Sequence, residues 1–171
     1  MPLVPWYKIP LDWIADKLLT TAKLADNSVT SAKLDQSTIK YAAVEISSAE
    51  ILALFTTPKT LVAAPGANKV LEFISLLLAY DYNATVYTIG AATNLQVKYT
   101  DAAGVAVSTT EAVTGMLDQA TDQLRALDKL EASVTPVANA VLVLTLAGAN
   151  PTLGDSPIHA KVAYRVHATG L

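Results

Sequence analysis

Between Ile9 and Val44 an apolar residue occupies every fifth position of the chain. A step of five residues turns about 140° around an α-helix, and on a β-strand it alternates between the two faces. A continuous helix or strand therefore cannot bury all of these side chains on one side. The positions in this fifth-residue pattern are Ile9, Ile14, Leu19, Leu24, Val29, Leu34, Ile39 and Val44.

Part of the pattern is a ten-residue repeat, in which TTAKL at residues 20–24 returns as TSAKL at residues 30–34. A unit of about one helical turn followed by an extended crossing fits this period, because Asp26, Asn27 and Ser28 supply turn and N-cap chemistry. A segment this thin has no second layer to pack against. Identical copies of the chain around a shared axis would supply that layer. We therefore predict an oligomeric stalk over residues 14–44; the alternative is a surface arm that wraps its own domain.

Residues 1–13 hold both tryptophans of the chain and three of its prolines. Proline fixes φ and keeps the preceding residue extended, so this segment is not a regular helix. Aromatic side chains on an extended arm suit docking into a groove of another protein. We predict an anchoring arm; the alternative is that the arm folds back onto the protein's own core. Its predicted contact residues are Trp6, Tyr7, Ile9 and Trp13.

Residues 45–171 carry the signals of a mainly β domain. Ser47 and Glu50 have capping-box spacing and Pro58 follows, which predicts a short helix over residues 48–55. Seven or eight strand-like stretches then alternate with turn residues, without βαβ alternation, and predict an antiparallel, jelly-roll-like β-sandwich. These stretches are 59–64, 70–82, 83–89, 95–100, 105–109, 132–135, 141–148 and 158–168. Residues 114–127 fit either a helix or a long loop.

Two of the strand-like stretches, 70–78 and 141–146, are largely apolar on both faces. Such strands are covered twice, by the core of the sandwich and by a second surface. A neighbouring subunit is one candidate for that second surface.

Charge and hydropathy exclude several classes of partner. The net charge is -3 and the 12 Lys and Arg residues are scattered, so no basic stripe exists to bind nucleic acid. The longest apolar stretch falls far short of the roughly 20 residues that cross a bilayer, and the N-terminus lacks a secretion signal. There are no cysteines. We expect a soluble protein that binds neither nucleic acid nor membrane.

No motif in the chain predicts catalysis, a cofactor or a metal site. His159 and His167 would lie about 26 Å apart on one strand, too far to share a metal. Ser156 lacks the GxSxG context of a nucleophile, and Asp118 and Asp122 are too sparse for a calcium loop. We expect a non-enzymatic structural or binding protein without a cofactor. Three tyrosines could stack on sugars if they are exposed, and otherwise pack within the sheet: Tyr80, Tyr82 and Tyr87.

The phrases KLADNSVTSAKL and STIKY resemble the linker repeats of fibre and appendage proteins from tailed bacteriophages. The segments SSAEILALFTTPKTLVAAPGANKVLEF, LQVKYTDAAGVAVSTT and VANAVLVLTLAGANPTLGDSPIHAKVAYRVH are similar to a domain of phage structural proteins. The resemblance implies a homotrimer without enzyme activity, assembled in the host cytoplasm and placed on the virion surface. Its arm would bind the capsid or other virion proteins.

The chain is short and lacks a long shaft, which favours a capsid decoration or head-fibre (spike) protein over a tail fibre. The alternative is a receptor-binding tail-fibre or tail-tip protein that recognises a host surface glycan or protein.

Overall fold

The structure is a computed structural model that describes residues 38–169. The predicted arm, and the stalk positions from Ile14 to Leu34, lie outside these residues. The described part contains one short helix and eight strands: β1 (Lys40–Ile46), α1 (Ser48–Ile51), β2 (Lys59–Val62), β3 (Lys69–Tyr80), β4 (Asn94–Tyr99), β5 (Ala106–Ala112), β6 (Gln123–Asp128), β7 (Leu142–Leu146) and β8 (Ile158–Ala168).

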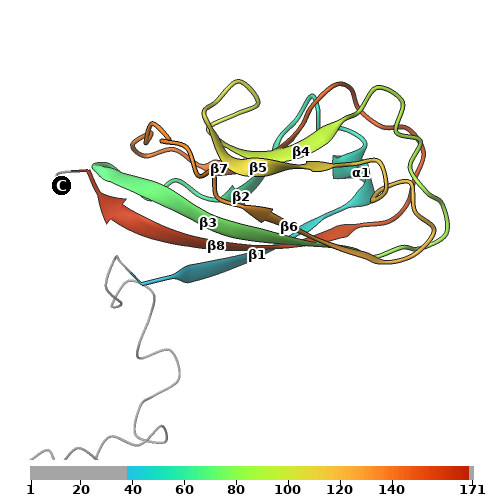
Figure 1. Cartoon of the computed structure of the whole chain (residues 1–171), viewed down its shortest axis with the longest axis horizontal. Coiled ribbons are helices and arrows are strands. Elements are labelled where there is room, and N and C mark those ends of the chain that lie inside the picture. The colour runs from blue at the N-terminus through green and yellow to red at the C-terminus, as the bar shows by residue number, and fades with distance from the viewer. Residues whose placement is uncertain (1–37, 170–171) are drawn as a thin grey trace, which may run out of the picture. The chain divides into compact units, whose positions relative to one another are not determined.

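The strands form two four-stranded antiparallel sheets that pack face to face (Figure 1). Sheet A has the order β1-β8-β3-β6 and sheet B the order β2-β7-β4-β5. Every connection between consecutive strands of the described region crosses from one sheet to the other, except the β4–β5 hairpin. This interleaved order is jelly-roll-like. The predicted antiparallel β-sandwich is confirmed.

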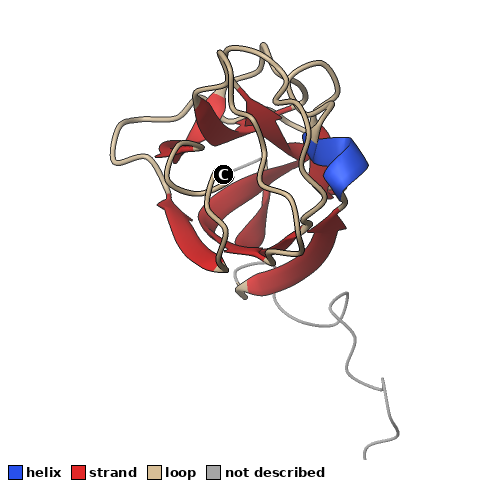
Figure 2. Ribbon diagram, turned by 90° about the vertical axis from the view of Figure 1, so that its right-hand side faces the viewer, coloured by secondary structure: helices blue, strands red, loops and turns tan. Residues whose placement is uncertain are grey.

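Figure 2 shows the two sheets from one end of the strands. Every second side chain along a strand points into the space between the sheets. On β4 the side chains of Leu95, Val97 and Tyr99 are buried, while the intervening residues lie on the outer face. β8 begins in the same way, with Ile158 and Val162 fully buried. Each buried aliphatic side chain contributes about 1.5–3 kcal/mol relative to exposure. The two-residue period therefore decides which face of each strand forms the core.

The helix begins where the capping box predicts and ends early. The Ser47 backbone N–H donates to Oε2 of Glu50 at 2.9 Å, and the Glu50 N–H donates to Oγ of Ser47 at 3.4 Å. The last helical residue is Ile51, so the prediction of a helix to residue 55 is wrong. The Phe55 N–H instead donates to Oδ1 of Asn150 at 2.8 Å. Before that contact, the Ala53 and Leu54 N–H groups already donate to carbonyls three residues earlier, so the chain continues in tight turns and not as an α-helix.

Three other predictions of local structure need correction. Residues 83–89 form only an isolated bridge between Thr88 and Thr152, because neighbouring backbone N–H groups donate to the side chain of Asp155. Residues 132–135 contain no strand. The ambiguous segment 114–127 ends in β6, which pairs with β3, and it contains no helix.

β1 begins at Lys40, inside the predicted stalk. Val44 pairs with Ala160 of β8 and packs against the core. The sandwich therefore includes the last position of the fifth-residue pattern. Ile39, the position before it, stands just ahead of β1 and is 40% exposed.

The two strands that are apolar on both faces, β7 and β3, differ in how completely the single chain covers them. All five residues of β7 are buried within a single chain, so this strand needs no neighbouring subunit for its outer face. β3 is covered less completely, because Leu77 on its outer side is 41% exposed.

Candidate interaction surfaces

The outer face of sheet A combines small residues with a few exposed apolar side chains. Ala43, Lys161, Leu77 and Ala126 lie in one row across β1, β8, β3 and β6. The neighbouring rows contain Tyr41, which is 65% exposed, and Leu124, which is 63% exposed. We call this surface the sheet A face. The same neighbouring rows also contain the exposed, charged side chains of Glu45 and Asp128.

Tyr41 lies at the edge of this face, two residues after Ile39. The Lys161 ammonium lies 5.4 Å from the centre of the Tyr41 ring, within the range of a cation–π contact. Ile39 and Tyr41 are thus two exposed apolar side chains at the start of β1, within the last residues of the predicted stalk.

The outer face of sheet B is hollowed into a groove of about 420 Å³. Asn94, Gln96 and Lys98 line it from β4, while Thr110 and Thr145 line it from the adjacent strands β5 and β7. Four lining residues come from loops: Phe55, Ala102, Ala147 and Gly148. We call this site the amide groove.

Three of the polar side chains that line the amide groove are held by hydrogen bonds to backbone carbonyls. The Thr145 hydroxyl donates to the Gln96 carbonyl at 3.0 Å, and the Gln96 carboxamide donates to the Ser108 carbonyl at 3.1 Å. The Lys98 ammonium donates to the Ala102 carbonyl at 2.8 Å. The alternation along β4 predicts the outward direction of its polar side chains, but the strands beside β4 become known only from the fold.

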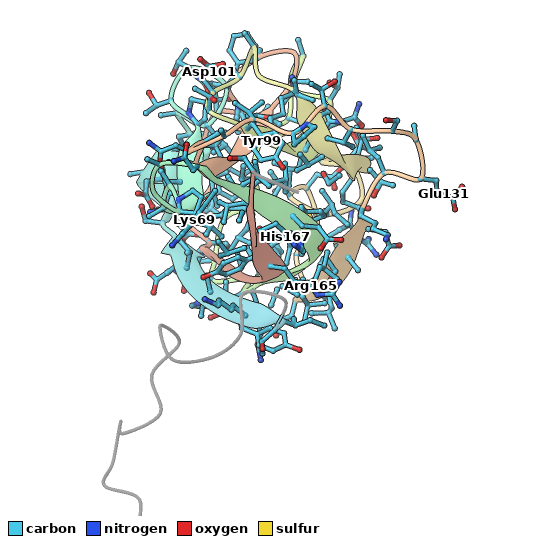
Figure 3. The ribbon with its side chains drawn as sticks, turned by 90° about the vertical axis from the view of Figure 1, so that its left-hand side faces the viewer. Lys69, Tyr99, Asp101, Glu131, Arg165 and His167 are labelled. Atoms are coloured by element: carbon cyan, nitrogen blue, oxygen red, sulfur yellow. The ribbon has the colours of Figure 1, made fainter. Side chains whose placement is uncertain are left out.

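A second hollow of about 260 Å³ lies between the sheets at the end seen in Figure 3 and is lined mostly by apolar residues. Arg165 and His167 of β8 stand close together at this end (Figure 3). His167 Nε2 lies 2.8 Å from Oε2 of Glu72, and Arg165 Nη1 lies 3.5 Å from the same oxygen. Burial disfavours ionisation of Glu72, but the hydrogen bond with His167 and the charge of Arg165 outweigh it and lower the pKa of Glu72. The cluster therefore holds an ionised carboxylate among basic partners.

The two histidines have separate partners. His159 Nε2 lies 3.7 Å from Oδ2 of Asp81, whereas His167 contacts Glu72. No group of three His, Asp or Glu side chains within residues 38–169 is close enough to hold a metal ion. Asp118 and Asp122 bind different backbone N–H groups, those of Gly115 and Tyr82.

The sugar-stacking alternative for the tyrosines is wrong for Tyr80 and Tyr87. Both side chains are 1% exposed and belong to the core. The Tyr87 hydroxyl donates to the Ser156 carbonyl at 2.6 Å, and burial raises the pKa of Tyr87 well above its usual value. Tyr82 uses its hydroxyl to donate to the Ala84 carbonyl at 2.7 Å. The rings of Tyr80 and Tyr87 pack with their centres 6.3 Å apart where β3 ends, at the opposite end of this strand from Lys69.

Asp155 organises the loop that the sequence suggested as a strand. Its Oδ1 accepts from the backbone N–H groups of Thr85 at 2.9 Å and Ala84 at 3.2 Å, and its Oδ2 accepts from the Asn83 carboxamide at 3.2 Å. The hydrogen bonds from the Thr85 and Ala84 backbones, with one from Ser156, lower the pKa of Asp155.

This cluster predicts a pH-dependent loop. Because the folded-state pKa is lowered, the contribution of Asp155 is complete above the unfolded value of about 3.9 and is lost as pH falls through the folded-state pKa. We expect the amide NMR shifts of Ala84 and Thr85 to titrate with a midpoint below that value. Asp155→Asn should abolish this titration. A midpoint at or above the ordinary value would contradict the assignment.

No family model matches the sequence, and no curated protein matches it. Among solved structures, the chain is similar to a chain described as the cyanophage Pam1 capsid asymmetric unit, with a TM-score of 0.41 and 16% identity over 75% of this chain and 83% of that chain. A likeness of this size assigns neither a fold family nor a function. No helix within the described residues is long and apolar enough to span a membrane.

Proposed function

We propose that this chain is a non-enzymatic structural protein of a bacteriophage virion. It forms a homotrimeric capsid decoration or head-fibre protein, is assembled in the host cytoplasm and stands on the virion surface. Residues 1–13 anchor it to capsid or other virion proteins through Trp6, Tyr7, Ile9 and Trp13. The likeness of residues 14–44 to phage linker repeats supports the virion setting.

The observation that carries the proposal is the junction between the repeat and the sandwich. The fifth-residue pattern runs without a break into β1, where Val44 packs against the core and Ile39 and Tyr41 remain exposed. A three-fold stalk ending at this junction would bring three copies of the exposed pair close together. Burying these side chains between copies is favourable, by about 25 cal/mol for each Å² of apolar surface.

Trimerisation also explains how a short arm can anchor the protein. Three arms on one stalk bind as linked modules, so the second and third arms attach at a high effective concentration. The avidity of the trimer can then exceed the affinity of one arm by a factor of about 10²–10⁴.

Deleting residues 1–13 is therefore expected to leave a folded trimer that no longer attaches to particles. The test is co-sedimentation of the deleted and full-length proteins with purified particles that lack this protein. Light scattering and circular dichroism on the same samples serve as controls for oligomeric mass and folding. Undiminished co-sedimentation of the deleted protein would refute the anchoring role.

A further inference from the structure

We propose that the amide groove on sheet B binds a glycan that carries a carboxylate, such as a uronic-acid oligosaccharide. This binding activity goes beyond the proposed structural role and rests on the groove alone. The volume of about 420 Å³ lies within the range of roughly 300–1,000 Å³ that is common for small-molecule sites.

The groove offers polar groups that can both donate and accept hydrogen bonds. The Asn94 carboxamide and the Thr110 hydroxyl line the groove, and neither makes a side-chain hydrogen bond to another residue in the described range 38–169. A carboxamide donates and accepts at once, and a hydroxyl does the same. Sugar hydroxyls also do both, so they match this set better than an apolar ligand does.

The lining of the groove also includes an aromatic side chain. Phe55 lines the groove and is 41% exposed, although large aromatic side chains are usually buried. Its backbone is held by Asn150, whose carboxamide also donates to Oγ1 of Thr56 at 3.2 Å. An exposed ring on a fixed turn can stack on the apolar face of a pyranose. The fixed backbone lowers the ordering cost of binding.

The lining of the groove carries a positive charge. Lys98 is the ionisable side chain among the residues that line the groove, in a chain whose net charge is -3. An ammonium has three N–H donors, and the Ala102 carbonyl accepts from one of them. The remaining donors can bind a carboxylate, and no carboxylate of the groove lining competes for them. A sugar acid is therefore favoured over a neutral sugar.

Competing uses of the groove fit less well. An apolar ligand would leave three polar groups of the groove lining without a partner in the ligand: the Asn94 carboxamide, the Thr110 hydroxyl and the Lys98 ammonium. The two buried tyrosines considered above as stacking platforms are closed to any ligand.

The test is saturation-transfer NMR on the full-length protein with hyaluronan tetrasaccharide as the acidic probe and maltotetraose as the neutral probe. We expect signal transfer to the acidic probe and binding several-fold weaker for the neutral one. Phe55→Ala and Asn94→Ala should each weaken binding of the acidic probe about tenfold, the loss expected for a stacking contact or a good hydrogen bond. Lys98→Met should abolish the preference for the acidic probe.

Leu124→Ala provides the matched control, because this exposed side chain lies on sheet A and should not affect sugar binding. Absence of transfer to both probes, equal binding of the two probes by the unchanged protein, or undiminished binding by Phe55→Ala and Asn94→Ala would each overturn the proposal. Light scattering on the same samples reports oligomeric mass separately. A failure of sugar binding is thus distinguishable from a failure of the trimer.

Discussion

Replacing Leu24, Val29 and Leu34 together with Asp is expected to reduce the mass of the protein in solution from three chains to one. All three positions belong to the fifth-residue pattern, and the proposed stalk buries them around a common axis. A buried, unpaired carboxylate costs several kcal/mol, and the trimer would contain nine of them. Multi-angle light scattering should therefore give the mass of a single chain, 18.0 kDa.

A matched control separates the position of the charges from their number. Thr21→Asp, Asn27→Asp and Ser31→Asp add the same three charges to the repeat at positions outside the pattern. This variant should keep the trimeric mass. A trimer that survives the first set of substitutions, or dissociates equally with both sets, would refute burial at every fifth residue.

Gly148→Ala is expected to destabilise the sandwich by several kcal/mol. Gly148 has a φ of +91°, and a Cβ built there lies 2.0 Å from the Ala91 carbonyl oxygen. That oxygen belongs to the backbone ahead of β4, so the clash forces two chain segments apart. The neighbouring hydrogen bond from the Thr93 N–H to the Ala147 carbonyl, at 2.9 Å, would be disturbed as well.

Gly66 provides a close control, because its φ is +98° and a Cβ built there has no atom within 4 Å. Gly66→Ala should cost only the backbone strain, about 1–3 kcal/mol. The free energies of unfolding in urea, measured at one protein concentration, should therefore differ by about 2 kcal/mol or more between the two variants. Equal losses would mean that the approach to Ala91 is not a constraint on the fold.

The sequence alone predicts the sandwich because several strands carry a clear two-residue period. Leu95, Val97 and Tyr99 alternate with polar residues, and the first residues of β8 do the same, so the sequence alone distinguishes the inner from the outer faces of these strands. The capping box of Ser47 and Glu50 likewise identified the start of α1. These signals are local and depend only on neighbouring residues.

The remaining features depend on contacts between distant residues. β6 carries no clear apolar alternation, since Leu124 and Ala126 lie on its exposed side, and the strand forms because β3 supplies its partner. Residues 83–89 have strand-like composition, yet Asp155, more than sixty residues later, binds their backbone. The amide groove depends on such contacts as well, because Thr110 and Thr145 join Gln96 only through the order of strands in sheet B.

The most direct test of the proposed function is to measure how many copies of this protein a purified phage particle contains, by quantitative mass spectrometry against the major capsid protein. A trimeric capsid decoration protein occupies symmetry-related sites, so we predict on the order of hundreds of copies per particle, in a fixed ratio to the capsid protein. A handful of copies would contradict a place on the capsid and favour the tail. Absence of the protein from purified particles would contradict the virion role itself.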